Sequence, residues 1–176
     1  MITCSFTGHR IQRLGSKEID DKKCIEIKNW LERTSEKLII EKGVTRFISG
    51  MALGTDQWGA LAILNLKKKY PNLLLEAAIP SRDFHESWSD KNKKQFMNIL
   101  KQCDNIKYFA NKYNLNNIYT RNRYLVDECQ VLLAVWDTVP KGGTYRTITY
   151  GIKKNKSLIF LNPTEMTIGY RRGAKF

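Results

Sequence analysis

Long apolar runs are missing from this sequence. The longest, VLLAV at 131–135 and LIFL at 158–161, have the length of strands, far short of the roughly 20 residues of a membrane-spanning helix. The N-terminal residues, MITCSFTG, begin a predicted strand at once and lack the basic and apolar segments of a secretory signal. We therefore expect no membrane span and a cytoplasmic location.

Cysteine and histidine are scarce, with four and two residues in a chain of 176. The cysteines are far apart in sequence, form no CxxC pair and have no histidine at ligand spacing. They are Cys4, Cys24, Cys103 and Cys129. We expect these thiols to be reduced and structural, and we predict neither a metal site nor a cofactor.

Acidic residues are outnumbered, since 30 Lys and Arg face 17 Asp and Glu and leave a net charge of +13. A positive surface potential favours anionic partners without choosing among them. The lysines gather in clusters, such as 67–69 and 153–156, at the ends or on the polar sides of predicted helices. Three interpretations stay open: a solvated surface, a nucleic-acid surface, and attraction of a small polyanion.

Repeats and low-complexity linkers are also missing, so we expect one domain over residues 1–176, with the tail 163–176 as an edge strand or a peripheral segment. Short β-rich runs alternate with longer amphipathic segments, the pattern of an α/β domain with a mainly parallel sheet. Strands are predicted near 2–7, 45–49, 73–79, 105–109, 130–136 and 157–161, and helices near 21–42, 55–69, 90–102, 118–128 and 144–154.

Standard phosphate-binding motifs are absent as well. The stretch VWDTVPKGGTYRTITYG at 135–151 predicts a strand, a glycine loop and a helix, but it has neither the ending of a P-loop nor the three glycines of a dinucleotide fingerprint. Asp137 ends the strand, Gly142 and Gly143 form the turn, and Thr144 is predicted to cap the helix. The loop therefore offers a backbone cradle for an anion.

Ligands of open parallel sheets bind outside the carboxyl ends of the strands, so the other loops that follow strands are candidates too. In FTGHR, Gly8 allows close backbone approach, and His9 and Arg10 offer side chains that bind anions; Thr7 is a further candidate ligand contact. The alternative interpretation is a tight turn with polar surface residues.

The second loop, SGMALGTDQWGA at 49–60, contains a turn that precedes a predicted helix. The amides of a helix beginning near Thr55 could bind a phosphate, and Asp56 could accept a hydrogen bond from a ribose hydroxyl. Alternatively, Thr55 or Asp56 is only an N-cap. The candidate ligand contacts in this loop are Gly50, Met51, Gly54, Thr55 and Asp56.

Two further segments carry arginine near aromatic residues. In PSRDFHESWSD at 80–90, Arg82 and Trp88 could sandwich a base or could anchor the loop on the core. On the next predicted helix, Arg121 and Arg123 could clamp a phosphate through bidentate hydrogen bonds. The alternative for this arginine pair is a solvated helix face.

The segments TGHR, SGMALGTDQWGA, RNRYLVD, LLAVWD and GGTYRTITYG, in this order, resemble the SLOG superfamily, most closely its YpsA-like stand-alone branch. The resemblance extends from Ile2 to about Leu161. It implies a Rossmann-like three-layer α/β/α fold, a pocket for nucleotides or nucleotide-derived molecules, and a homodimer or larger homo-oligomer. Carried over to this sequence, the pocket would use Gly8 with His9 or Arg10, Gly50 to Asp56, Arg121 with Arg123, and Gly142 to Thr144.

One departure from the family pattern bears on catalysis. The related LOG enzymes carry a PGGxGTxxE signature whose glutamate is needed for glycosidic cleavage, and Thr149 takes that position here. Threonine neither stabilises an oxocarbenium-like centre nor activates water well. Asp56 or Asp137 could act from another direction, so the departure disfavours an enzyme without excluding one.

The resemblance and this departure together favour a protein that binds an ADP-ribose-like, NAD-derived or cyclic nucleotide signal without turning it over. A narrower form of this hypothesis is sequestration of the signal, as in a protein that counters antiviral defence. Two alternatives stay open. One is a LOG-type N-glycosidase or nucleotide hydrolase, and the other is a nucleic-acid-binding protein like DprA.

Overall fold

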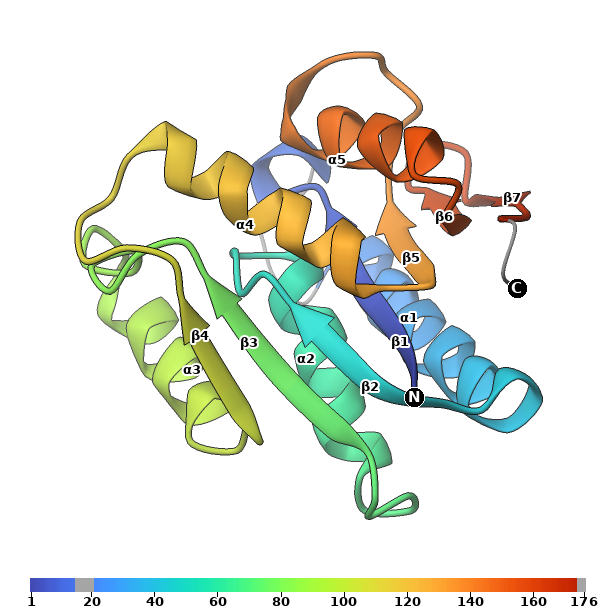
Figure 1. Cartoon of the computed structure of the whole chain (residues 1–176), viewed down its shortest axis with the longest axis horizontal. Helices are drawn as coiled ribbons and strands as arrows, with labels where there is room; N and C mark the ends of the chain where they lie inside the picture. Colours follow the sequence, from blue (N-terminus) through green and yellow to red (C-terminus); the bar gives the residue numbers. More distant parts are fainter. Residues whose placement is uncertain (15–20, 174–176) are drawn as a thin grey trace.

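The chain folds into a seven-stranded sheet between two layers of helices, in a computed structural model that describes residues 1–14 and 21–173 (Figure 1). The strands are β1 (Ile2–Gly8), β2 (Val44–Ser49), β3 (Leu74–Ile79), β4 (Asn105–Tyr108), β5 (Val131–Val135), β6 (Ser157–Asn162) and β7 (Thr167–Arg171). The helices are α1 (Lys22–Lys42), α2 (Thr55–Leu66), α3 (Asp90–Leu100), α4 (Leu115–Glu128) and α5 (Gly142–Lys153), with a short 3-10 helix, η1 (Ile11–Leu14).

The order of the strands reverses at β1. The sheet runs β4-β3-β2-β1-β5-β6-β7, and every neighbouring pair is parallel except β6 and β7. The chain therefore moves outward from β1 to β4 on one side, then returns to place β5 and β6 on the other. Connections leave the carboxyl ends of β1 and β5 in opposite directions, which opens a crevice at that point of a parallel sheet.

The helices divide between the two faces of the sheet. Helices α1, α2 and α3 pack together on one face, and α4 and α5 pack together on the other (Figure 1). All five residues of β5 are buried because this strand lies between β1 and β6 and is covered from both sides. These layers confirm the predicted Rossmann-like α/β/α fold with a mainly parallel sheet.

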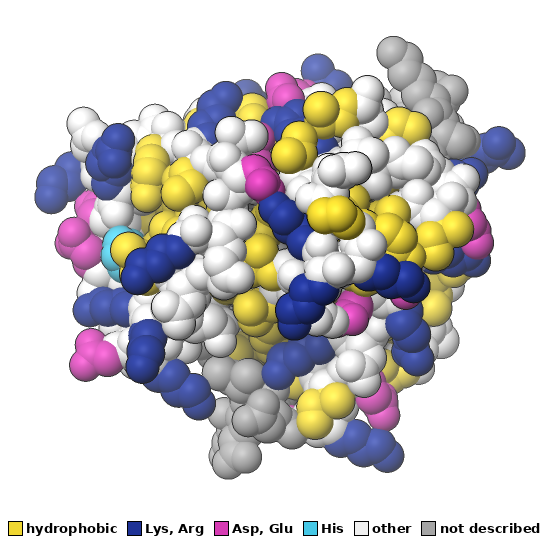
Figure 2. Space-filling model, turned by 90° about the horizontal axis from the view of Figure 1, so that it is seen from below, with side chains coloured by type: hydrophobic (Ala, Val, Ile, Leu, Met, Phe, Trp, Pro, Cys, Tyr) yellow, Lys and Arg dark blue, Asp and Glu magenta, His cyan; other side chains and the backbone are white. Residues whose placement is uncertain are grey.

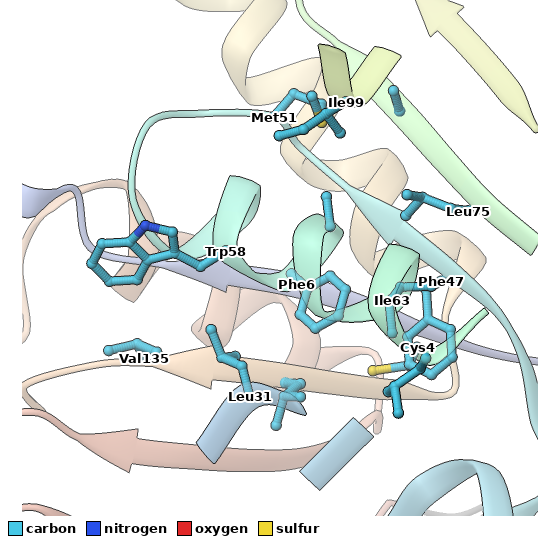
Figure 3. Packing of buried hydrophobic residues seen from close by; sticks show 14 of the residues in the cluster. Cys4, Phe6, Leu31, Phe47, Met51, Trp58, Ile63, Leu75, Ile99 and Val135 are labelled. Carbon is cyan, nitrogen blue, oxygen red and sulfur yellow. The ribbon is translucent and has the colours of Figure 1, made fainter. Parts of the chain in front are cut away.

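The larger hydrophobic core lies between the sheet and helices α1 to α3. Figure 3 shows Phe6 and Phe47 from the central strands beside Trp58 and Ile63 of α2. Full burial of an apolar side chain of this size stabilises a fold by about 1.5–3 kcal/mol. Smaller clusters under α4 and α5, around Leu125 and Ile148, complete the opposite layer.

Capping residues fix where helix α1 begins and ends. Asp21 caps α1 by accepting a hydrogen bond from the Lys23 amide, and Gly43 ends the helix in the left-handed region at φ 64°. The edge-strand interpretation of the tail is right for β7, whereas residues 174–176 lie outside the described part of the chain. No helix in the described ranges is long and apolar enough to cross a membrane.

Lys and Arg side chains are spread over the surface of the molecule. Figure 2 shows them distributed across the face seen from below, between polar and apolar side chains and fewer acidic ones. Several pair with a carboxylate, as Lys67 does with Asp104 and Lys69 with Glu36. On this face the excess positive charge does not collect in one continuous patch.

Candidate ligand-binding site

A cavity of about 400 Å³ opens at the carboxyl ends of β1 and β5. It occupies the crevice that the reversal of strand order creates, and its volume is in the range of small-molecule sites. Its walls come from the β1 loop, η1, the β2–α2 loop, α4 and the start of α5. The lining residues are Thr7, Gly8, His9, Arg10, Gln12, Arg13, Ala52, Asp56, Ile118, Arg121, Asn122, Gly143 and Thr144.

A buried ion pair forms one wall of the cavity. Arg121 of α4 and Asp56 of α2 meet with 3.1 Å between Nη1 and Oδ2, and their side chains are only 5% and 8% exposed. The Ala52 amide donates a second hydrogen bond to Oδ2 of Asp56. The Nε atom of Arg121 is buried and has no hydrogen-bond partner among the described residues. A guanidinium at the cavity wall thus has donor capacity that the protein does not use.

Burial acts against both charges of this pair. It raises the pKa of Asp56 and lowers that of Arg121, and the attraction between the two groups opposes each shift. Arg10 lies close enough to influence the pKa of both groups, and its side chain is exposed at the mouth of the cavity. A bound anion beside Arg121 would replace part of the solvation that the guanidinium has lost.

The loop between β2 and α2 fits closely around Arg121. A Cβ atom at Gly50 would lie 1.4 Å from Nη1 of Arg121 and 2.6 Å from Oδ2 of Asp56, so only glycine leaves room for the ion pair. Gly54 has φ 96°, and a Cβ there would lie 2.8 Å from the His9 carbonyl oxygen. Both glycines are needed where the loop approaches other groups of the site.

The start of α2 is tied to the β1 loop. The hydroxyl and the amide of Thr55 donate to the carbonyl oxygen of His9, at 3.0 and 3.4 Å. Gly54 is the N-cap of α2 and gives no side-chain cap. Thr55 and Asp56 therefore hold neighbouring elements, which corrects the alternative interpretation of either residue as an N-cap.

His9 lies buried between β5 and α5. Its Nε2 atom is 2.9 Å from Oδ1 of Asp137, and its Nδ1 atom is 3.4 Å from the Thr144 hydroxyl oxygen. Burial lowers the pKa of His9, although the adjacent Asp137 carboxylate acts in the other direction. The Asp137 amide also donates to Nε2 at 3.1 Å, so the tautomer of the neutral ring sets which nitrogen donates and which accepts.

Arg13 joins the first and last loops of the site. Its Nε atom is 3.0 Å from Oδ2 of Asp137, and its Nη1 donates to the Lys141 carbonyl oxygen at 3.3 Å. Burial alone would raise the pKa of Asp137, but hydrogen bonds from the Val139 amide, His9 and Arg13 lower it overall. Sequence reasoning missed Arg13, although it follows Arg10 by one turn of η1.

The N-terminus of α5 faces the cavity without a side-chain cap. Its N-cap residue is Lys141, so the predicted cap at Thr144 is wrong, and Thr144 instead lies in the first helical turn with its hydroxyl toward His9. The first amides of a helix have no partner within it and carry its positive dipole end. Gly143 is exposed in the lining of the cavity, and no atom outside its own helix and chain neighbours lies within 4 Å of the position that its Cβ would take.

The structure places the other predicted site residues at different distances from the cavity. Gly50, Gly54, Thr55, Asp137 and Gly142 lie directly behind the lining residues and contact them. Met51 instead packs in the hydrophobic core. Ala52 lies within the segment Gly50 to Asp56 that the resemblance assigned to the pocket, whereas the sequence analysis named none of the lining residues Gln12, Arg13, Ile118 and Asn122.

Three predicted residues lie outside this cavity. Arg82 stacks over the ring of Tyr108, and Trp88 packs against Phe84 and Phe96, so the third loop anchors itself on the core. Arg123 is exposed in a separate groove between α4 and α5. Residues two apart on a helix do not face each other, so Arg121 and Arg123 do not form the predicted clamp.

Two acid–base side chains line the cavity, His9 and Asp56, and each already contacts other side chains of the protein. Asp56 is the one carboxylate among its lining residues, and Arg121 holds it in an ion pair. Thr149 lies on α5, half-buried and outside the lining. The described residues contain no cluster of three or more His, Cys, Asp or Glu side chains that could hold a metal ion.

Comparison with known proteins decides the family. The family model of YpsA, described as the YspA SLOG family, matches residues 4–163. This chain belongs to the YpsA family of SLOG proteins. All the loops that line the cavity lie within the matched region.

Bacterial proteins are among the relatives of this YpsA-family chain. The SPbeta prophage-derived protein YoqJ of Bacillus subtilis is 30% identical over 73% of this chain and 82% of YoqJ. A UPF0398 protein of Lactobacillus helveticus is 31% identical over 77% of this chain and 72% of its own length. The protein YpsA of Bacillus subtilis is 25% identical over 81% of this chain and 79% of its own length.

Proposed function

We propose that this YpsA-family protein binds a nucleotide-derived small molecule, with a phosphate group in the cavity at the ends of β1 and β5, and does not turn it over. One observation carries the proposal. The buried guanidinium of Arg121 lies at the cavity wall with an unpartnered Nε. Buried polar groups are nearly always satisfied in folded proteins, and the partner that we propose for this guanidinium is an anion that enters the cavity beside it.

The surroundings of Arg121 support a phosphate in particular. The open amides of α5 at Gly143 and the exposed guanidinium of Arg10 line the same cavity. Helix N-termini bind phosphate through backbone amides and the dipole, and arginine adds bidentate hydrogen bonds. Three elements distant in sequence thus contribute residues with hydrogen-bond donors to the lining of one cavity.

The arrangement of the carboxylates supports binding without cleavage. Asp56 is paired with Arg121, and Asp137 is held by His9 and Arg13. A glycosidic hydrolase needs a carboxyl group that is free to transfer a proton or to stabilise positive charge at the sugar. Both carboxylates here are engaged in keeping cationic groups in place.

We further propose that capture of the ligand is itself the biological effect, so that the protein lowers the free concentration of an ADP-ribose-like, NAD-derived or cyclic nucleotide signal. The description of YoqJ as prophage-derived supports this narrower form. A prophage protein that removes such a signal would counter a host response that depends on it.

Calorimetry with AMP, ADP-ribose, NAD and a cyclic dinucleotide tests the proposal. At least one ligand should bind with a dissociation constant below about 1 mM, and chromatography should recover it intact. Charged hydrogen bonds contribute about 1.5–3 kcal/mol, so Arg121→Gln should weaken binding by about 10- to 150-fold. Arg121→Lys keeps the positive charge beside Asp56 but loses the bidentate hydrogen bonds of the guanidinium, so it should weaken binding less.

The exposed Arg33 of α1 provides the matched control, because Arg33→Gln removes the same charge far from the cavity. Thermal melting of each variant separates loss of the site from loss of the fold. Absence of binding to every ligand, or equal binding by Arg121→Gln, Arg121→Lys and Arg33→Gln, would overturn the proposal.

A further inference from the structure

A second cavity, of about 220 Å³, lies between α4 and α5 beside the first. It is lined by Tyr119, Asn122, Arg123, Arg146, Thr147 and Tyr150. Asn122 lines both cavities, so the two meet along α4. We call this second cavity the α4/α5 groove.

Two bridges between arginine and tyrosine cross the α4/α5 groove. Arg146 of α5 lies over the ring of Tyr119 of α4 at 5.3 Å and donates to its hydroxyl. Arg123 of α4 lies over the ring of Tyr150 of α5 at 5.8 Å. Each helix contributes both partners four residues apart, on one face of the helix. The groove therefore has flat, cationic and aromatic surfaces at two successive turns.

The chemistry of the lining favours one kind of ligand group. No carboxylate lines the α4/α5 groove, although the Tyr150 hydroxyl donates to Asp127 outside it. Nucleobases stack on tyrosine rings and on guanidinium planes. The side chains of Asn122 and Thr147 add donors and acceptors that can pair with the edge of a base.

We propose that the α4/α5 groove binds the nucleobase of a ligand whose phosphate occupies the first cavity. This inference rests on the proposed function and makes it more specific, since it selects nucleotides over phosphorylated sugars and inorganic anions. The shared Asn122 marks where the ribose connects the two parts of the ligand. A base in the groove would cover the Tyr119–Arg146 bridge, which is exposed in the free protein.

The test compares AMP with ribose 5-phosphate, which has the same sugar and phosphate but no base. Stacking contributes about 1–3 kcal/mol per base, so AMP should bind the natural protein about 5- to 150-fold more tightly. Tyr119→Ala should remove most of this difference by weakening AMP, and should leave ribose 5-phosphate unchanged. Tyr119→Phe, which keeps the ring, should retain most of the affinity for AMP. Arg121→Lys should weaken both probes.

The outcomes separate this inference from the proposed function. Equal affinities for the two probes, both reduced by Arg121→Lys, would retain the phosphate site and reject the base subsite. A preference for AMP that Tyr119→Ala does not change would place the base elsewhere and also reject the subsite. Failure of the natural protein to bind either probe would overturn the subsite, and failure to bind the whole nucleotide panel would overturn the proposed function with it.

Discussion

Arg121 depends on a single glycine for its position. The guanidinium lies against the backbone of Gly50, where any side chain would occupy the place of Nη1. The Asp56 carboxylate and the Ala52 amide then fix the direction of the ion pair. The donor at the cavity wall is therefore held by packing as well as by charge, which keeps it in place before a ligand arrives.

Gly50→Ala tests this packing directly. The new methyl group has to displace Arg121 or the loop, and overpacking of a buried site costs about 1–3 kcal/mol. We expect a lower midpoint of urea unfolding together with a loss of nucleotide binding. Gly143→Ala is the control for stability, because no atom outside its own helix and chain neighbours lies within 4 Å of the new methyl group. Equal stability of the two variants would contradict the packing role of Gly50.

His9 makes the stability of the protein depend on pH. Burial lowers its pKa, so between the ordinary value of about 6.5 and the lowered one the unfolded chain binds the proton first. Stability is then complete above about pH 6.5 and falls as the pH drops below it. His9→Gln should remove this fall in urea unfolding at pH 7.5 and 5.5. The pKa of Asp137 is lowered, so this group changes the stability only near and below its usual pKa of about 4.

At the scale of elements, one substitution at the N-terminus of α5 should change protein stability and phosphate binding in opposite directions. Gly143→Asp places a carboxylate among the open amides, where it stabilises the helix by about 0.3–1 kcal/mol and repels a phosphate. We expect an unchanged or higher unfolding midpoint and at least a tenfold loss of nucleotide binding by calorimetry. The uncharged Gly143→Asn should bind much better than Gly143→Asp. Strong binding by the Asp variant would show that the phosphate lies elsewhere.

Hydrophobic periodicity was sufficient to predict the parallel strands and the five main helices to within a few residues. One of the differences arises from a capping group. Helix α4 begins at Leu115, before the predicted start, because the Asn114 side chain accepts a hydrogen bond from the Asn117 amide. Helix α2 ends at Leu66, ahead of the turns that precede Pro71.

The loops that follow β1, β2 and β5 could be assigned to one site from their order alone, because parallel strands end at the same edge. Side-chain partners could not be assigned in this way. Arg121 and Arg123 are neighbours in sequence but point to two different cavities. Trp88 could bind a base or pack on the core, and its neighbour Phe96 on α3 becomes adjacent only in the folded chain.

At the scale of the whole molecule, the position of the site follows from topology. Only at β1 and β5 do the connections run to opposite sides of the sheet. Helix α5 follows β5, helix α2 follows β2 beside β1, and neither helix has a side-chain cap. The first turns of these two helices, at Asp56 and at Gly143 and Thr144, therefore line the same cavity as Arg121.

Net charge provides a test of nucleic-acid binding as an alternative function. The charge of +13 attracts polyanions at low salt, but on the face in Figure 2 the cationic side chains are dispersed. Binding through many phosphate contacts weakens steeply with salt, with a slope of about −0.7 per phosphate for single strands. We expect a fluorescent oligothymidylate to dissociate as salt rises from 50 to 200 mM, whereas nucleotide affinity should change less than about tenfold.

Competition between the two ligands decides which of them the cavity serves. An oligonucleotide held only by the general surface charge should not displace AMP or ADP-ribose from the site at 200 mM salt. It should also bind Arg121→Gln and Arg33→Gln equally, because each variant loses one positive charge. An oligonucleotide that stays bound at 200 mM salt, displaces the nucleotide and is weakened only by Arg121→Gln would make the cavity a nucleic-acid site.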